Sequence, residues 1–369
     1  MASLIEIKDV DRQFYESRLR DWLPDKIIDI HTHVWRDSDY RPNVPRRGEE
    51  RSVTWPDRVA KDNPIEDLLE TYRLMLPGKR VTPLIFPTIP QEGNLEQING
   101  YISDCSARAS VPGLIFSDPA WSAATLEERV LAGGFIGAKS YLSLAPAHIP
   151  SKEIRILDYF PRHQLEVHNR HGWIVMLHIP RDGRLKDPLN LAQMLEIERD
   201  YPNISLIIAH VGRAYCNEDA GNAFEVLAGT ERMCFDFSAN TNDYIFEQIL
   251  RCVGPKRVLF GTDMPILRMR MRRVTRDGHY VNIVPKGLYG DVSDDRNMAE
   301  VEGAEAEALT FFLYEELDAF RLASERVGLT SASLEDVFYH NARRLIDRAG
   351  GSVNAATLTP ATAKETKEI

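Results

Sequence analysis

Residues 26–33 read KIIDIHTH, an apolar run that ends in two histidines separated by one residue. A short apolar run of this kind is typical of a buried β-strand. Side chains alternate between the two faces of a strand, so His31 and His33 project from one face, about 7 Å apart. Asp29 has the same parity and lies one step deeper. Two imidazoles so placed can bind one metal ion; a pair of surface histidines after a buried strand is the alternative interpretation.

Seven more apolar segments follow, with helical segments between most of them. Strands are predicted at residues 80–89, 113–118, 135–142, 173–179, 204–211, 233–238 and 257–263. Helices are predicted near residues 94–109, 122–132, 153–170, 187–200, 217–228 and 242–253. Apolar strands that alternate with helices indicate a parallel sheet covered by helices. Counting the first strand, eight such units predict an α/β fold, the (β/α)8 TIM barrel.

The segments outside this alternation suggest three parts. Residues 1–24 are predicted to form an N-terminal helical extension, residues 25–349 the barrel domain, and residues 350–369 a disordered tail rich in Ala, Thr, Lys and Glu. We predict Asn63 as the cap of the helix that begins at residue 64. Long βα loops are expected at 35–63 and 268–300, and extra C-terminal helices at 300–327 and 333–348.

Charge and composition exclude several classes of partner. The net charge of −10 argues against nucleic-acid binding, which needs a basic face, and against an anionic membrane surface. No apolar stretch approaches the ~20 residues that span a bilayer. The four cysteines form no CxxC pair, and the N-terminus shows no pattern of a signal peptide. Reduced thiols and a cytoplasmic protein are therefore expected.

Residues of metal-binding types end five of the predicted strands. They are His31 and His33 on the first strand, Lys139 on the fourth, His178 on the fifth, His210 on the sixth and Asp263 on the eighth. The C-terminal ends of barrel strands meet at one mouth, where barrel enzymes carry out their chemistry. Buried ionisable groups need mutual partners or a metal, so a single site is favoured over six separately satisfied structural residues.

With their neighbours, these strand ends resemble the amidohydrolase superfamily, in the branch of aminocarboxymuconate-semialdehyde decarboxylase and related lactonases and decarboxylases. The motifs are DIHTH at 29–33, LH at 177–178, AHVG at 209–212, VLFGTDMP at 258–265 and HNARRL at 340–345. The resemblance covers residues 27–346. The order and spacing of the whole set are specific, whereas any single motif is not.

The resemblance implies a role for each strand end. His31, His33 and His178 would be neutral imidazole ligands of one divalent ion. Asp263 would contact both the metal and its bound water and act as general base. His210 would polarise the substrate or carry a proton. This ligand set suits Zn²⁺, with Mn²⁺ as the alternative; one ion is expected, or two if Lys139 and His210 hold a second.

Lys139 has three interpretations. In binuclear relatives a lysine on the fourth strand is carbamylated and bridges two metals. A free Lys139 could instead bind a substrate carboxylate as a point charge, or form a structural ion pair. The decarboxylases of this branch generally lack that lysine, so its presence here favours hydrolysis.

Six residues near the mouth are candidates for substrate binding: Trp35, Arg36, Arg181, Arg213, Arg268 and Arg270. Trp35 is either a stacking wall or part of the core. The arginines are either a solvated face or clamps for a carboxylate or phosphate. On an acidic protein, several arginines around one mouth indicate a small anionic or polyhydroxylated substrate.

These observations lead to a functional hypothesis with two alternatives. The first choice is a metal-dependent hydrolase that attacks a lactone, ester or amide with metal-activated water. The runner-up is a metal-dependent non-oxidative decarboxylase, which the fold and the ligands alone do not separate from a hydrolase. A non-catalytic binding protein is the third reading. The resemblance also suggests a homodimer.

Overall fold

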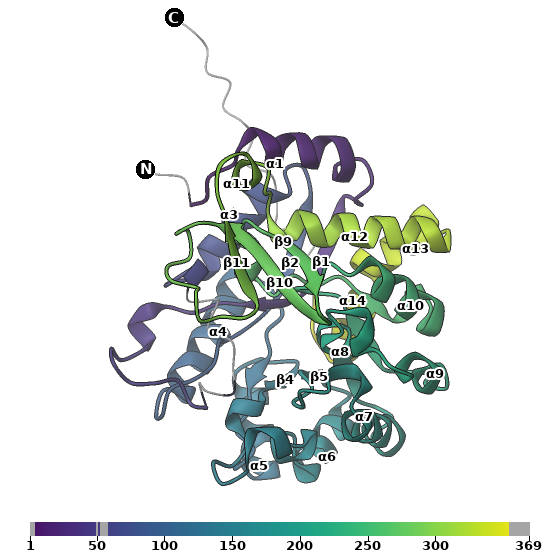
Figure 1. The fold of residues 1–369 in the computed structure, drawn as a ribbon. Coiled ribbons are helices and arrows are strands. Elements are labelled where there is room, and N and C mark those ends of the chain that lie inside the picture. Colours follow the sequence, from purple (N-terminus) through teal and green to yellow (C-terminus); the bar gives the residue numbers. More distant parts are fainter. Residues whose placement is uncertain (1–3, 49–50, 52–57, 354–369) are drawn as a thin grey trace, which may run out of the picture.

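The structure, a computed structural model, describes residues 4–48, 51 and 58–353 (Figure 1). Eight short parallel strands form its centre. They are β1 (Lys26–His33), β2 (Arg80–Phe86), β3 (Ile115–Phe116), β4 (Gly137–Ser140), β5 (Ile174–Leu177), β6 (Ser205–Ile208), β7 (Cys234–Asp236) and β8 (Val258–Leu259). β1 pairs with β2, and β3 to β8 pair in chain order.

Backbone contacts close these two sheets into a ring. A parallel bridge from Ile85 to Gly113 joins β2 to β3. On the other side, the Ile30 amide donates to the Phe260 carbonyl at 3.1 Å and the Asp263 amide to the His31 carbonyl at 2.7 Å. The first and last strands therefore meet, which confirms the predicted TIM barrel.

A change of register in β1 turns the two histidines into the barrel. The pairing of β1 with β2 shifts between Asp29 and Thr32, which is the mark of a β-bulge. Ile28, before the bulge, and Ile30, within it, belong to the apolar cluster inside the barrel. Asp29 faces the helical layer, where it accepts from the Tyr72 hydroxyl at 2.7 Å. The expectation that Asp29 shares a face with His31 is therefore wrong, because a bulge breaks the alternation of period two.

Most predicted helices lie around the strands (Figure 1). They are α3 (Ile65–Met75), α4 (Leu95–Ala109), α5 (Ala123–Ala132), α6 (Arg162–His171), α7 (Pro188–Asp200), α9 (Ala223–Leu227) and α10 (Asp243–Val253). The helix predicted at 153–170 begins only after Pro161, because a residue before proline disfavours the helical conformation. Asn63 does not cap α3; its side-chain amide donates to the His33 carbonyl at 2.6 Å.

Residues 268–300 are not an irregular loop, as was expected, but contain a three-stranded sheet. β9 (Arg272–Arg276) and β10 (His279–Pro285) form an antiparallel hairpin, and β11 (Met298–Val301) runs parallel to β10. The hairpin turns at Asp277 and Gly278, which both have positive φ, at 50° and 72°. An Asp-Gly pair is a known hairpin signal. The sequence did not predict strand β9, because its residues are polar and largely exposed and form no apolar run.

The terminal helices pack together on one side of the barrel. α1 (Asp9–Phe14) continues as a π-helical turn and packs on α12 (Phe312–Val327), where Phe14 and Tyr15 stack on Tyr314 at 6.1 and 5.8 Å. The helix predicted at 300–327 is thus shorter, because the residues before it form β11 and α11 (Gly303–Glu307).

The last helices are α13 (Ser331–Glu335) and α14 (Asn341–Arg348), which join through a π-helical turn. α14 adds Leu345 and Ile346 to the apolar cluster inside the barrel. Most of the tail predicted at 350–369 lies outside the described residues. Within the described ranges, no helix has the length and apolar character needed to cross a bilayer.

Candidate metal centre

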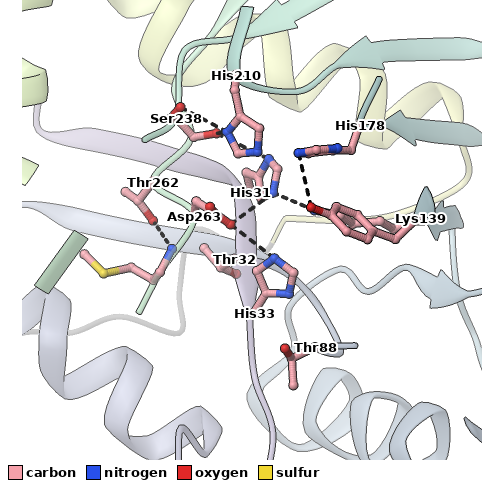
Figure 2. A network of polar contacts seen from close by, with 12 residues as sticks. His31, Thr32, His33, Thr88, Lys139, His178, His210, Ser238, Thr262 and Asp263 are labelled. Atoms are coloured by element: carbon pink, nitrogen blue, oxygen red, sulfur yellow. Dashed lines mark hydrogen bonds and ion pairs between the residues drawn. The ribbon is translucent and has the colours of Figure 1, made fainter. Parts of the chain in front are cut away.

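Two histidines and an aspartate converge at the barrel mouth (Figure 2). His31 Nε2 lies 3.3 Å from Asp263 Oδ1, and His33 Nε2 lies 3.1 Å from the same oxygen. The histidines end β1, and Asp263 follows β8 at the seam of the barrel. One ligand atom from each residue falls within 4.8 Å of the others, so a single ion could contact all three.

The outer ring nitrogens fix the tautomers of three histidines. Nδ1 of His31 faces Asp236 Oδ2 at 3.0 Å, Nδ1 of His33 faces the Pro87 carbonyl at 2.8 Å, and Nδ1 of His210 faces the Ser238 carbonyl at 3.1 Å. Carboxylates and carbonyls only accept, so each neutral ring carries its proton on Nδ1. Each Nε2 therefore keeps its lone pair. A hydrogen bond from the other ring nitrogen to a carboxylate or carbonyl is usual for histidines that bind a metal.

The charges at the mouth require a cation. Burial lowers the pKa of His33 to about 4, so its neutral Nε2 points a lone pair at Asp263. Burial opposes the ionisation of Asp263, but hydrogen bonds and positive charge from the imidazoles, His31 first, hold its pKa well below the ordinary range. Rings that present lone pairs do not supply this charge, so a cation must take its place. Burial likewise opposes ionisation of Asp236, yet His31 lowers its pKa to about 2. A buried carboxylate that faces two imidazole lone pairs, with a second buried carboxylate behind His31, fits a divalent metal ion.

The pKa of His31 also shows that the carboxylates around it favour a positive charge. Burial and the charge of Lys139 act to lower the pKa of His31, but Asp236 and Asp263 raise it above the ordinary value. Either a proton or a metal ion can satisfy these two carboxylates. The residues present therefore fit a bound metal.

His178 lies beside this group but not inside it. Its ring centroid is 4.5 Å from Tyr141 and 5.3 Å from His210, and its Nε2 is 3.5 Å from the Tyr141 hydroxyl. Burial lowers its pKa well below the ordinary range. Its buried Nδ1 has no hydrogen-bond partner among the described residues. A buried nitrogen without a partner is costly, so His178 has a free coordinating atom, and its role as a ligand stays a prediction.

Lys139 is the last residue but one of β4 and points into the cluster. Its Nζ lies 2.6 Å from His31 Nε2 and 4.2 Å from the ring centroid of Phe86. Burial lowers the pKa of Lys139 to about 8. In the described part of the chain, no carboxylate lies within salt-bridge distance of this amine, so the structural ion pair is not formed. The bridging and substrate-binding roles remain open.

Asp236 and Ser238 were missed in the sequence. Asp236 Oδ1 accepts from the His210 amide at 2.9 Å, while its other oxygen contacts His31. The Ser238 hydroxyl contacts His210 Nδ1 at 2.9 Å. The predicted strand at 233–238 runs two residues past the end of β7 at Asp236, so the acid stood inside the prediction, and Ser238 at its end is not a metal-binding residue type. The available signal was an acid inside the apolar run MCFDF at 233–237, since an acid buried in a strand needs a partner.

A strained turn presents His210. Residues 210–213 all have positive φ, at 57°, 46°, 60° and 60°, and so form one left-handed turn. A Cβ atom on Gly212 would lie 2.5 Å from Leu185 Cδ1, so this position requires glycine. Left-handed conformations cost roughly 1–2 kcal/mol per non-glycine residue. Such strain is concentrated at functional sites, and Asp263 shares it with φ of 60°.

Several of the predicted substrate-binding side chains have structural partners instead. Trp35 is buried, and its Nε1 donates to the Lys61 carbonyl at 3.0 Å, so it belongs to the core. Arg36 pairs with Asp39 through two bonds, and Arg181 pairs with Asp187.

Arg268 and Arg270 are also internal. Arg268 Nη2 donates to Asn63 Oδ1 at 2.6 Å, and burial lowers the pKa of Arg268 to about 10. Arg270 forms a bidentate salt bridge with the buried Asp11 of α1, at 2.9 and 2.7 Å. Neither guanidinium is available to a substrate in this arrangement. Arg213 differs, since its Nη1 contacts the carbonyls of residues 179–181 and no carboxylate among the described residues.

The parallel barrel and the histidines and aspartates at its C-terminal mouth are typical of TIM-barrel enzymes that bind a metal ion. The chain belongs to the amidohydrolase family, whose model matches residues 28–348. Comparison with curated proteins finds no relative that matches.

Solved structures share the fold at low sequence identity. An amidohydrolase from Burkholderia multivorans, solved with bound zinc, is 13% identical, with a TM-score of 0.54, over 88% of this chain and 99% of that one. The 5-carboxyvanillate decarboxylase of Sphingomonas paucimobilis is 11% identical, with a TM-score of 0.52, over 87% and 99%. A probable 2-pyrone-4,6-dicarboxylic acid hydrolase from Acinetobacter baumannii, solved with citric acid, is 14% identical, with a TM-score of 0.50, over 86% and 98%.

Proposed function

We propose that this protein is a metal-dependent hydrolase that adds water to the carbonyl carbon of a small anionic lactone, ester or amide. The observation that carries the proposal is that Nδ1 of His31, His33 and His210 each lies against an oxygen that only accepts. An acceptor holds each Nδ1, and the Nε2 atoms of His31 and His33 both face Asp263. This arrangement serves a metal centre better than three separate structural histidines.

His31, His33 and Asp263 would hold the ion, with His178 as the fourth proposed ligand. A divalent ion bound there polarises a carbonyl and lowers the pKa of water toward about 7. The nitrogen and oxygen donors suit zinc, which is also bound in the structure from Burkholderia multivorans. We therefore propose zinc, with manganese as the alternative.

Asp263 is the proposed general base. Its low pKa keeps the carboxylate ionised at neutral pH, so it can accept a proton from the attacking water. The same carboxylate contacts both proposed ligand histidines, so it would lie beside a water held by the ion. The proton can then pass to the leaving group.

The tautomer of His210 changes its proposed role. With its proton on Nδ1, neutral His210 can accept a proton through Nε2 but cannot donate one to an oxyanion. Lys139 is the better donor, since it is a buried amine in contact with the cluster.

The protonation states of His33, His178 and His210 remove these three rings, but not Lys139, as donors of the proton that the carboxy-lyase alternative would need. A decarboxylase must deliver a proton to carbon. Burial lowers the pKa values of His33 and His210 to about 4, and that of His178 well below its ordinary value. None of these three rings carries an extra proton at neutral pH.

The test measures metal content and reaction products on the full chain, purified without added metal. Elemental analysis gives ions per chain. Small anionic lactones, esters, amides and carboxylic acids are then screened for release of acid with a pH indicator and for release of CO₂. We expect bound metal and metal-dependent release of acid without CO₂. His33→Ala should lose metal and activity, and the exposed control His148→Ala should keep both.

Each other outcome corrects the proposal. Metal-dependent release of CO₂ would replace the hydrolase by a carboxy-lyase. Metal content unchanged in His33→Ala would contradict the assigned ligands. Two ions that fall to one or none in Lys139→Ala would assign Lys139 to a second metal, whereas one unaffected ion would leave it to bind substrate.

A further inference from the structure

A pair of tyrosines stands next to the metal centre, outside its ligands. The ring centroid of Tyr215 lies 6.4 Å from that of His210. Tyr280 of β10 packs edge-on against Tyr215 at 5.1 Å. The inserted sheet therefore reaches the barrel mouth at this point. Two more contacts hold it there: Arg273 Nη1 donates to the Ala239 carbonyl at 2.6 Å, and the Thr275 hydroxyl contacts Cys216 Sγ at 3.7 Å.

Three arginines surround the two tyrosines. Arg184 Cζ lies 5.2 and 5.3 Å from the ring centroids of Tyr215 and Tyr280, and Arg273 Cζ lies 5.1 and 4.6 Å from them. Arg213, at the end of the left-handed turn, is the third. Burial raises the pKa of Tyr215, and the charges of all three arginines oppose that rise.

Only one of these three charges is neutralised by a carboxylate in the described part of the chain. Arg184 pairs with Asp219. Arg273 donates to the Ala239 carbonyl and to Asn282 Oδ1, and Arg213 donates to backbone carbonyls; neither forms a salt bridge there. Both side chains are partly buried. Partly buried charge without a counterion is unfavourable, so the surroundings of Tyr215 favour an anion.

We propose that Arg213 and Arg273 form an anion subsite, which binds a carboxylate group of the substrate remote from the reacting carbonyl. The subsite rests on the proposed function for its use in catalysis, but anion binding can be measured without turnover. It implies a substrate with at least one carboxylate that does not react. The subsite combines a barrel loop with the inserted sheet β9–β11, so this insertion sets part of the specificity (Figure 1).

The experiment titrates the full chain, as purified, with succinate and separately with inorganic phosphate in a calorimeter at low salt. We expect Arg213→Gln and Arg273→Gln each to weaken succinate binding by about tenfold or more, because a charge-assisted bidentate contact is lost. Arg273→Lys, which keeps the charge, should lose less. The control Arg272→Gln changes the exposed neighbour on β9, whose side chain pairs with Glu305, and should bind like the wild type.

The variants separate the anion subsite from the proposed metal-dependent hydrolase. His33→Ala should keep arginine-dependent succinate binding even if it loses the metal. Binding that disappears in His33→Ala and persists in both arginine variants would place the anion on the metal, and would overturn the subsite while leaving the hydrolase intact. No succinate binding by the wild type would also overturn it. Binding of phosphate in preference to succinate would replace the carboxylate by a phosphate group. If Arg273→Gln does not fold, Arg213→Gln and Arg273→Lys decide the result.

Discussion

At the scale of single residues, Asp236 joins the two halves of the site. One carboxylate oxygen contacts Nδ1 of the ligand His31, and the other accepts from the backbone amides of His210 and Ser238. Ser238 in turn contacts His210 Nδ1. A single buried carboxylate thus orients a proposed ligand and a proposed catalytic histidine.

We predict that Asp236→Asn lowers metal affinity by about 10- to 100-fold, the usual cost of losing the outer partner of a ligand histidine. The asparagine oxygen carries no full charge, so the Nδ1–H of His31 is held less firmly. Competition with a chelator of known affinity measures the change. Asp219→Asn, which alters a buried carboxylate paired with Arg184, is the control. Equal affinities in wild type and Asp236→Asn would exclude this role.

His168 gives the fold a specific sensitivity to acid. It is fully buried on α6 beside Phe160 and Trp173, and neither ring nitrogen has a partner among the described residues. Burial lowers its pKa to about 3, against about 6.5 in an unfolded chain. The unfolded state therefore binds a proton that the native state does not, and stability falls as the pH drops from about 6.5 toward 3.

We predict that His168→Leu removes part of this acid sensitivity. Between pH 7 and pH 5, one such histidine costs the wild type up to about 2 kcal/mol. The variant should lose less stability over this interval, as measured by urea unfolding at both pH values. The exposed His148→Gln should follow the wild type. If wild type and His168→Leu lose the same free energy of unfolding between pH 7 and pH 5, other groups account for the loss of stability in acid.

At the scale of elements, the salt bridge between Arg270 and Asp11 attaches α1 to the segment after β8. Asp11 is fully buried and also accepts from the Thr310 hydroxyl at 2.7 Å. Arg270 adds a contact with the Leu309 carbonyl at 2.7 Å. The arginine that the sequence suggested as a substrate clamp is thus an anchor for the N-terminal helix.

We predict that Arg270→Ala lowers the free energy of unfolding by about 3–5 kcal/mol, because it leaves Asp11 buried without a cation. The double variant Asp11→Ala/Arg270→Ala should lose less than the sum of the single variants, because it leaves no unpaired charge. Urea denaturation measures all three. Arg272→Ala, on the exposed face of β9, should change stability by less than about 0.5 kcal/mol. A higher KM with unchanged stability would restore Arg270 as a substrate ligand.

These contacts show where sequence reasoning succeeds and where it fails. The apolar runs predict the barrel because burial on both faces leaves a direct mark on composition. The polar strand β9 and the bulge after Asp29 leave no such mark. The partners of Arg270 and Arg268 are remote in the chain, at Asp11 and Asn63, so local charge patterns could not identify them. Metal-binding residue types at strand ends could be predicted, but Asp236, the last residue of β7, was concealed by its apolar neighbours.

At the scale of the whole molecule, the candidate metal centre lies across the seam of the barrel. His31 and His33 belong to the first strand, and Asp263 follows the last. Few backbone bonds join these strands, among them Ile30 to Phe260 and Asp263 to His31. Asp29 adds side-chain bonds, accepting from the Thr262 amide at 3.0 Å and the Thr262 hydroxyl at 2.6 Å. An ion held by residues of both strands would therefore join the two ends of the barrel.

Removal of the metal should consequently weaken the seam more than the rest of the barrel. A ligand at 1,000 times its Kd stabilises the native state by about 4 kcal/mol, so chelation should lower Tm by about 5 °C, and added zinc should restore it. Hydrogen exchange locates the effect. The amides of Ile30 and Asp263 should exchange faster without metal, whereas the Ala209 amide, which bonds to Leu177 on the far side, should keep its protection. Equal acceleration at all three amides would show that the metal stabilises the barrel globally and not at the junction of β1 and β8.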